Sequence, residues 1–296
     1  MSGIRAGLAS TPYLNSINRP ALLATAPFFI FAIVMMVMPT VALLVTAFVD
    51  KQGALTLANF VEIATPEVAD AFMASAKISG ATAVLGTVFG LMLALTVGRG
   101  MASQRVKAAV MTFCGVASHF SGIPLAFAFI ATLGRLGLVT MVLRNTFGID
   151  IYAAGFDLAS FSGLALTYLF FQVPIALTII MPAIERLSTQ TREAAEILGA
   201  TTTQYWRFVG LPILWPTILG SLALLFANAF GGIATAYALT GTAVNVIPIL
   251  LYAQIRGDVL HNEQLGAVLA LLMVLVMTVA ISLYLMLRVH AERWLK

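Results

Sequence analysis

Long apolar stretches alternate with short polar segments along the chain. Six of these stretches are long enough to cross about 30 Å of hydrocarbon as helices, which rise 1.5 Å per residue. We expect these spans at residues 21–49, 71–97, 108–133, 161–184, 214–239 and 264–287. A seventh apolar segment, 245–252, is too short to cross and contains Pro248, so it predicts a short re-entrant or interfacial helix. The pattern predicts an all-α polytopic membrane protein with six transmembrane helices.

The composition supports this class. Of 296 residues, 60% are hydrophobic and only 9% are charged, against about 25% charged in an ordinary soluble domain. This excludes a disordered chain, a fibrous repeat, a disulfide-stapled secreted domain and a typical cytosolic enzyme. The first apolar stretch exceeds the core of a signal peptide, so we expect it to be retained. The chain then divides into a polar N-terminal tail, 1–20, and a single transmembrane domain, 21–296.

The basic residues are unevenly distributed between the two sides that six spans define. The two tails and the second and fourth loops hold 11 of the 16 Lys and Arg residues: Arg5, Arg19, Arg99, Arg105, Lys107, Arg186, Arg192, Arg207, Arg288, Arg293 and Lys296. The other loops hold the remaining five, namely Lys51, Lys77, Arg135, Arg144 and Arg256, together with eight of the twelve acidic residues, for a net charge of 5 − 8 = −3. Because cytoplasmic loops are enriched in Lys and Arg, both termini are predicted to lie in the cytoplasm.

Two further features of the composition exclude other classes of protein. The chain has one cysteine, Cys114, so it has neither an internal disulfide nor a cysteine-based metal cluster. Its net charge of +4 comes without any run of five basic residues, which argues against a nucleic-acid partner. We therefore expect no bound metal and no nucleic acid.

The fourth loop, 185–212, has a pattern of its own. It continues after Ser188 as TQTREAAEILGATTTQYWRFVGLP. Ser188 is a suitable N-cap for a first helix, and Gly199 is a suitable residue to end it. Thr201 with Gln204 three residues later predicts a capping box for a second helix, and Pro212 is expected to begin the fifth span. The loop is thus predicted to form two short helices hinged near Gly199.

This loop resembles the EAA loop of ABC-importer permeases. The match comprises Glu193-Ala194-Ala195, three residues, Gly199, nine residues, Val209, one residue, and Leu211-Pro212. The family has Ile where this chain has Val209, which is a mild departure. Six spans, both ends inside, and the position of the loop between spans four and five also agree with the type I ABC-importer permease fold.

The resemblance implies a function and a set of partners. The chain would be the transmembrane permease subunit of an importer in the inner membrane of a bacterium, without catalytic residues or a cofactor of its own. ATP and Mg would bind to a partner, a cytoplasmic ABC ATPase dimer, since this chain has no G-x-x-x-x-G-K-[ST] phosphate loop. A second permease subunit, with a heterodimer favoured, and a periplasmic substrate-binding protein would complete the transporter. The residues expected to couple the chain to the ATPase are Glu193, Ala194, Ala195, Gly199, Thr201, Leu211 and Pro212.

Several residues inside the expected spans are candidates for lining the solute pathway. They are Tyr168, Gln172, Asn228 and Tyr237, and helix-packing hydrogen bonds explain them equally well. His119 is ionisable and is expected within the third span; a hydrogen bond to a neighbouring helix is its favoured interpretation. Gly86 and Gly90 form a GxxxG step, which predicts close helix packing inside one subunit.

Several substrates are compatible with the sequence, and two other functional classes are alternatives to an importer permease. The segments FANAFGGIATAYALTG and VNVIPILLYAQI look most like the polyamine-carrying subfamily, with 2-aminoethylphosphonate, ferric iron or an opine-like compound as alternatives. An intramembrane enzyme lacks support, because the chain has neither H-E-x-x-H nor G-x-S-x-G. An ion-coupled secondary transporter would need buried acidic residues inside its spans and a repeated span pattern.

Overall fold

The computed structural model describes residues 19–98, 103–187, 189–256 and 262–292. Within these ranges the chain is helical apart from loops and one isolated bridge between Val49 and Leu55. The helices are α1 (Arg19–Ala32), α2 (Met38–Thr46), α3 (Pro66–Gly98), α4 (Gln104–Ala117), α5 (Ile123–Leu133), α6 (Leu138–Phe147), α7 (Phe161–Arg186), α8 (Thr189–Ile197), α9 (Thr202–Tyr205), α10 (Leu211–Phe230), α11 (Ile233–Thr240), α12 (Ile247–Arg256) and α13 (Glu263–Glu292). The prediction of an all-α protein is confirmed.

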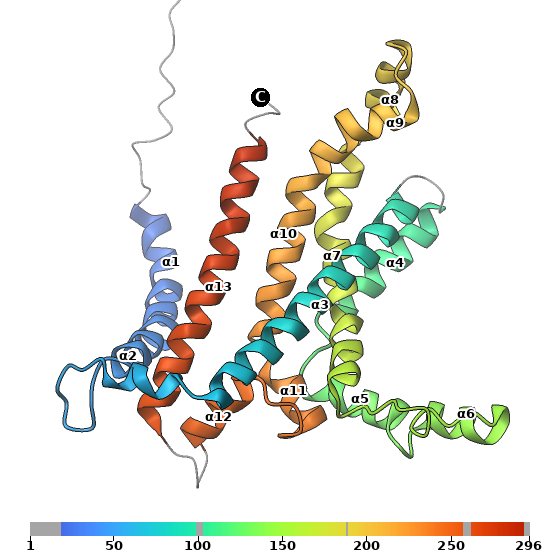
Figure 1. The fold of residues 1–296 in the computed structure, drawn as a ribbon. Coiled ribbons are helices and arrows are strands. Elements are labelled where there is room, and N and C mark those ends of the chain that lie inside the picture. Colours follow the sequence, from blue (N-terminus) through green and yellow to red (C-terminus); the bar gives the residue numbers. More distant parts are fainter. Residues whose placement is uncertain (1–18, 99–102, 188, 257–261, 293–296) are drawn as a thin grey trace, which may run out of the picture.

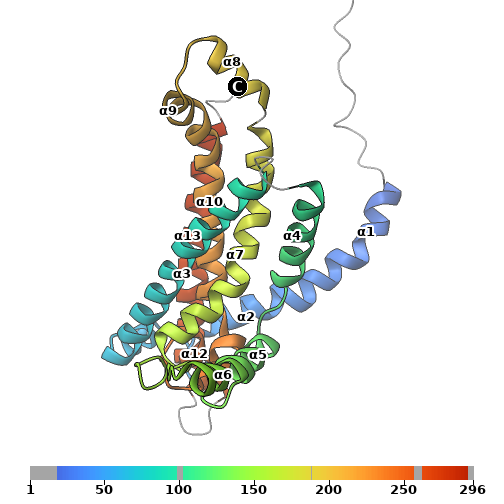
Figure 2. The ribbon, with the colours of Figure 1, turned by 90° about the vertical axis from the view of Figure 1, so that its right-hand side faces the viewer.

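The long helices run side by side between two ends of the molecule. In Figure 1, α8 and α9 lie at one end, which we call the α8 end, and α11 and α12 lie at the other, the α12 end. The start of α1 and the end of α13 both lie toward the α8 end. Figure 2 shows α3 and α4 on opposite sides of α7, and α6 extends sideways from the α12 end in Figure 1.

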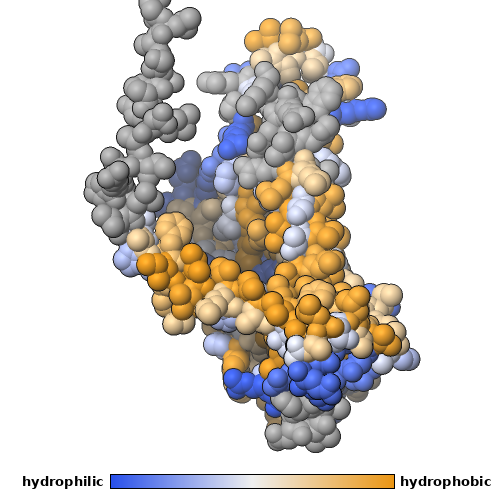
Figure 3. All heavy atoms as spheres, turned by 90° about the vertical axis from the view of Figure 1, so that its left-hand side faces the viewer, coloured by the Kyte–Doolittle hydropathy of each residue, from blue (hydrophilic) through white to orange (hydrophobic). Residues whose placement is uncertain are grey.

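Within the residues that the structure describes, six helical segments are long and apolar enough to cross a membrane, as the sequence predicts. They are Thr25–Thr46, Pro66–Gly98, Ile123–Phe147, Phe161–Arg186, Thr202–Phe230 and Glu263–Met286. Apolar side chains cover the middle of the face shown in Figure 3, and hydrophilic ones gather at the α12 end. This distribution is what a lipid bilayer requires of a protein that spans it.

The expected third span, 108–133, is not one helix. It is divided into α4 and α5 by a turn at residues 118–122. Gly122 has φ +74°, which favours glycine, and Pro124 stands at the start of α5, where its missing N–H costs no helical hydrogen bond. The segment in this region that meets the criteria of length and hydropathy joins α5 to α6 instead, across the bend at Gly134–Gly137.

The expected fifth span, 214–239, is wrong at both ends. Helical structure begins at Thr202 and continues through a wide π-helical turn, Trp206–Gly210, directly into α10. It stops at Phe230, because Gly231 and Gly232 follow and α11 begins as a separate helix. The short apolar helix expected at 245–252 is present as α12.

The charge count placed Lys77 in a loop, but this residue lies in a helix. It is in the fourth turn of α3 and is exposed. Removing it leaves four basic residues on the side opposite to the eleven, so the asymmetry of charge becomes larger.

Helices α3 and α7 pack closely against each other at three glycines. A methyl group placed on Gly90 would overlap Ala176 Cβ, and one on Gly98 would lie 2.7 Å from Ile184 Cγ2. At Gly86 it would lie 3.1 Å from Gln172 Cβ. Glycines four or eight residues apart therefore let α7 lie directly on the backbone of α3, and the predicted GxxxG packing within one subunit is confirmed.

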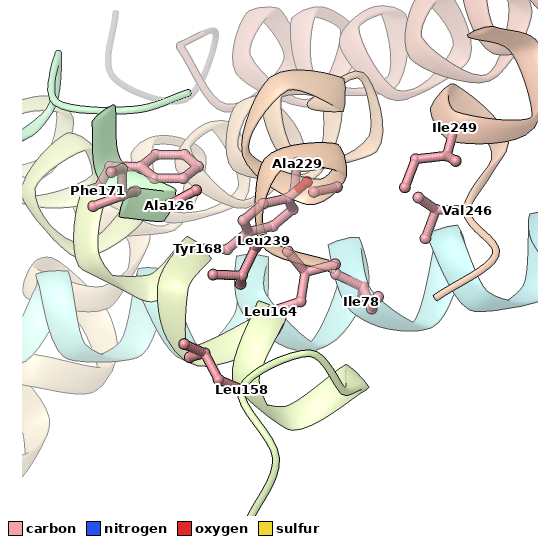
Figure 4. Packing of buried hydrophobic residues seen from close by; sticks show 12 residues of the cluster. Ile78, Ala126, Leu158, Leu164, Tyr168, Phe171, Ala229, Leu239, Val246 and Ile249 are labelled. Atoms are coloured by element: carbon pink, nitrogen blue, oxygen red, sulfur yellow. The ribbon is translucent and has the colours of Figure 1, made fainter. Parts of the chain in front are cut away.

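A buried cluster joins this helix pair to the shorter helices of the α12 end. Figure 4 shows Tyr168 and Leu164 of α7 among side chains from α3, α10 and α11, including Ile78, Ala229 and Leu239. Phe171 and Ala126 extend the cluster toward α5. The short helices are thus held by the long ones.

Substitution of Gly90 by Ala is expected to destabilise the protein, and the same substitution at Gly80 is not. The added methyl group overlaps Ala176 at position 90, whereas nothing lies within 4 Å of it at position 80. Gly90→Ala should lower the free energy of unfolding by about 1–3 kcal/mol through overpacking. Gly80→Ala should leave it unchanged or raise it by about 0.5–1 kcal/mol, because alanine is the better helix former. Thermal unfolding in detergent measures both, and equal shifts for the two variants would contradict the packing described here.

Single cysteines placed at the two ends of the molecule test the orientation. In a Cys114→Ser background, Leu55→Cys is expected to react with an impermeant thiol reagent added to intact cells. Gln104→Cys and Thr203→Cys are expected to react only after permeabilisation, because the α8 end carries the excess of basic residues. All three positions are exposed. The opposite pattern would reverse the orientation.

Candidate functional site

The fourth loop forms a hinged projection at the α8 end. Helix α8 ends at Ile197, and Gly199, two residues later, has φ +79°. The Gly199 N–H donates to Glu196 O and the Ala200 N–H donates to Ala195 O, both at 2.9 Å. These two bonds constitute a Schellman motif, in which glycine supplies the left-handed residue that a β-carbon disfavours. The predicted hinge at Gly199 is confirmed, and the predicted cap, Ser188, lies outside the described residues.

The second arm of the hinge begins with the predicted capping box. Thr201 Oγ1 accepts from the Gln204 N–H at 3.3 Å, and Gln204 Oε1 accepts from the Thr201 N–H at 2.8 Å. The arm is not a separate short helix, however, since α9 continues into α10. The Leu211 N–H donates to Trp206 O, five residues back, and Pro212 follows within the first turn of α10. The wide turn lets the helix pass the proline without a break, so α9 and α10 form one continuous helical segment.

The matched loop residues differ in exposure. Glu193, Ala194, Thr201, Leu211 and Pro212 are exposed, and Ala195 is half-buried. Two short-range contacts hold the projection together: Arg192 Nε lies 2.9 Å from Glu196 Oε1, and Thr191 Oγ1 lies 3.4 Å from the Tyr205 hydroxyl across the hinge.

The tip of the projection is apolar. Ile197 and Leu198, the last residues before Gly199, are each 86% exposed. They lie at the end of the molecule and outside the six segments long enough to cross a membrane. The sequence analysis singled out neither of these two side chains. Two exposed large aliphatic side chains beside a turn form a small apolar surface outside the segments that could cross a membrane.

An ion pair connects the base of the loop to a second helix. Lys107 Nζ of α4 lies 2.7 Å from Glu185 Oε1 at the end of α7, and both side chains are partly exposed. The pair holds the start of α4 beside the point where the loop leaves α7. Spacing along the sequence gave no signal for it, since 78 positions separate the two residues.

The four candidate pathway residues are not brought together. Tyr168 and Gln172 are buried, and both make hydrogen bonds between helices: Tyr168 Oη donates to Gly232 O at 2.6 Å, and Gln172 Nε2 donates to Leu225 O at 3.3 Å. Asn228 is exposed on α10. Tyr237 is in α11, 46% exposed, with its ring 5.4 Å from that of Tyr252. Tyr168 and Gln172 thus hold helices together, while Asn228 and Tyr237 face outward.

The sequence analysis favoured a hydrogen bond from His119 to a neighbouring helix, but the His119 side chain makes none in the described part of the chain. It is exposed in the turn between α4 and α5. The turn itself is fixed by Thr235 of α11, whose Oγ1 accepts from the Gly122 N–H at 2.8 Å and lies 3.3 Å from Gly122 O.

At the far end of α6, an aspartate closes the loop that returns to α7. Asp150 Oδ2 lies 2.7 Å from Arg144 Nη2, and Oδ1 accepts from the N–H groups of Tyr152 and Ala153. The backbone bond from Ala153 and the guanidinium of Arg144 lower the pKa of Asp150 below its ordinary value.

Across the described ranges, no three His, Cys, Asp or Glu side chains are grouped so as to hold a metal ion.

Comparisons with known proteins find similar permease proteins of several transport systems. The chain is 26% identical over 190 residues to the sulfate transport system permease protein CysT of Salmonella typhimurium, covering 63% of this chain and 64% of CysT. It is 27% identical over 231 residues to the molybdenum transport system permease protein ModB of Mycobacterium tuberculosis, covering 76% of this chain and 80% of ModB. Other relatives are named for thiamine and ferric transport. No protein-family model matches.

The fold is that of a solved transporter. A chain of a bacterial alginate ABC transporter, solved in complex with an alginate pentasaccharide-bound periplasmic protein, matches with a TM-score of 0.66 and 18% identity. The match covers 90% of this chain and 92% of that one. The chain spans a little under two thirds of CysT and most of ModB. In sequence and in fold, the chain is therefore similar to the permease components of ABC importers.

Proposed function

We propose that this chain is the membrane permease subunit of an ATP-driven importer, and that its fourth loop couples it to a cytoplasmic ABC ATPase dimer. The observation that carries the proposal is the apolar tip, Ile197 and Leu198, on a hinge between two membrane-crossing helices. A tip inserted into a groove of the ATPase would move with that groove, and α9 would pass the motion into α10 without a flexible joint. ATP and Mg would be bound by the ATPase.

The remaining partners follow from the relatives. We propose a second permease subunit, with a heterodimer favoured, and a periplasmic substrate-binding protein that docks at the α12 end. The transporter would lie in the inner membrane of a bacterium with both termini of this chain in the cytoplasm. The partition of basic residues supports this orientation. The start of α1 and the end of α13 also lie toward the α8 end, on the same side as the fourth loop.

The cargo is a small solute. The sequence favours a polyamine-like organic cation, with 2-aminoethylphosphonate, ferric iron or an opine-like compound as alternatives, and the named relatives add oxyanions to the candidates. Stimulation of ATP hydrolysis by the binding protein loaded with each solute in turn would identify the cargo. An ion-coupled secondary transporter is the competing class, and it requires uptake that persists without ATP.

Removing the apolar tip should uncouple the ATPase. Burial of one leucine side chain contributes about 1.5–3 kcal/mol, so Leu198→Ser should weaken association with the ATPase about tenfold or more. Leu57, 70% exposed at the other end of the molecule, offers a matched control, Leu57→Ser. Pull-down of the ATPase and ATP hydrolysis stimulated by the binding protein measure the effect. Equal behaviour of both variants would contradict the docking role of the loop.

The hinge itself should require a left-handed residue. Gly199→Val should reduce coupling more than Gly199→Asn, because asparagine tolerates positive φ and a β-branched residue does not. Both variants should insert into the membrane, since position 199 lies outside every span. Coupled ATP hydrolysis in proteoliposomes measures the order, and an asparagine variant as impaired as the valine variant would argue against a conformational role for this glycine.

The ion pair at the base of the loop should respond to charge reversal. Lys107→Glu places two carboxylates side by side and is expected to lower both stability and transport. The double variant Lys107→Glu, Glu185→Lys should restore much of the loss. A partly exposed pair contributes about 0.2–1 kcal/mol, so the readout is the coupling energy of a double-mutant cycle from thermal unfolding. Strictly additive effects would show that the pair has no energetic role.

A further inference from the structure

Helix α6 stands apart from the long helices. Figure 1 shows it extending sideways from the α12 end, across the direction in which α7, α10 and α13 run, and Figure 2 shows it at the same end. Thr140 is the one buried residue of this ten-residue helix. The chain enters α6 from α5 and returns to the start of α7, both at the α12 end. Helix α6 therefore does not carry the chain from one end of the molecule to the other.

The length of the helices agrees with this placement. The segment Ile123–Phe147 is long and apolar enough to cross a membrane as a whole. The bend at Gly134–Gly137 divides it into α5, with 11 residues, and α6, with 10. At a rise of about 1.5 Å per residue, neither helix alone crosses about 30 Å of hydrocarbon.

The charges around α6 place it where the protein meets water. Arg135 precedes the helix, Arg144 lies in its last turn, and Asp150 follows it. Arg144 Nη2 lies 2.7 Å from Asp150 Oδ2, and Arg135 Nη2 lies 3.9 Å from Asp157 Oδ2, with all four side chains partly exposed. Charged side chains are costly in the centre of a bilayer. Helix α6 is therefore at the level where the crossing helices leave the hydrocarbon.

One face of α6 is apolar and open. Leu138 and Val142, one helical turn apart, are 69% and 46% exposed, and Val139 beside them is 37% exposed. At about 3.6 residues per turn, Arg144 lies on the opposite face. That face meets the return loop, because Arg144 pairs with Asp150. The helix is thus amphipathic, with its polar face held by the loop and its apolar face uncovered.

The surface of a lipid bilayer has the chemistry that suits this face. A short helix at the membrane boundary, with charges on one side and branched apolar residues on the other, lies in the plane of the interface. Residues 135–160 hold two Arg and two Asp, so their net charge is 2 − 2 = 0. Both Arg side chains are already paired within the protein. Insertion of apolar side chains, rather than attraction to anionic headgroups, is therefore the interaction available to α6.

We propose that α6 is an interfacial helix, which lies on the bilayer surface with Leu138, Val139 and Val142 among the lipids and Arg144 toward water. The segment Ile123–Phe147 then does not cross the membrane as one unit. The helix would anchor the end of α5, whose Leu125 is fully buried in the cluster at the α12 end. Only the assignment to the outer leaflet rests on the proposed function.

Spin labels on single cysteines measure the depth of this face. In a Cys114→Ser background, Leu138→Cys and Val142→Cys are labelled in the transporter, purified with its partner chains and reconstituted into phosphatidylcholine vesicles. Val279→Cys is the control for lipid, because Val279 is 58% exposed within a crossing segment of α13. Leu55→Cys is the control for water, because Leu55 is 85% exposed in the loop after α2.

The measured quantity is relaxation of the label by oxygen, which concentrates in lipid, relative to relaxation by a water-soluble nickel complex. We expect this ratio at Leu138→Cys and Val142→Cys to be several times that at Leu55→Cys and to remain below that at Val279→Cys. The ratio should not change when phosphatidylglycerol replaces part of the phosphatidylcholine or when salt is added, because the insertion is apolar. A ratio that depends on either would contradict the apolar mode of binding.

Three other results would overturn the inference. A ratio equal to that at Leu55→Cys would place the face in water. Immobilised labels that neither reagent relaxes would show that a protein covers the face, either the second permease or the binding protein. A ratio equal to that at Val279→Cys would show that the segment crosses the bilayer. In each case co-purification of an ATPase would leave the proposed function standing, whereas an ATPase that fails to associate would overturn that function without changing the measured depth.

Discussion

The arrangement of this protein depends on the direct contact between the backbones of α3 and α7. Three glycines, Gly86, Gly90 and Gly98, remove the side chains that would otherwise separate the two helices, and Ala176 occupies the space at the middle. Lipid tails are as apolar as the side chains between helices, so the hydrophobic effect does not drive helices together in a bilayer. Close van der Waals packing therefore holds α3 and α7 together. The remaining helices are placed relative to this pair.

Helix α7 links the two regions that matter for function. At one end it leads into the hinged loop and carries Glu185, which pairs with Lys107 of α4. Toward the other end it provides Tyr168, which fixes the break after α10. The loop is therefore connected to the break after α10 along two helices, through α7 by the Tyr168 hydrogen bond and through α10 by helical continuity.

The sequence predicted what local chemistry determines. The number of crossing segments followed from hydropathy, the hinge from Gly199, the capping box from Thr201 and Gln204, and the close packing from Gly86 and Gly90. The division of the third crossing was missed, because hydropathy averaged over a long window does not distinguish one helix from two helices joined by a five-residue turn. Gly122 and Pro124 were the available signal. The environment of His119 and the Lys107–Glu185 pair depend on contacts between distant segments, which one sequence does not reveal.

The central claim is that the apolar tip of the fourth loop lies in a groove of a partner ATPase. The most direct measurement is photo-crosslinking from a benzophenone amino acid at position 198 in intact membranes, with position 57 as the control. The account predicts a crosslink to an ABC ATPase from position 198 whose yield changes with ATP, and none from position 57. Crosslinking of position 198 to lipid alone, in membranes that contain the assembled transporter, would contradict it.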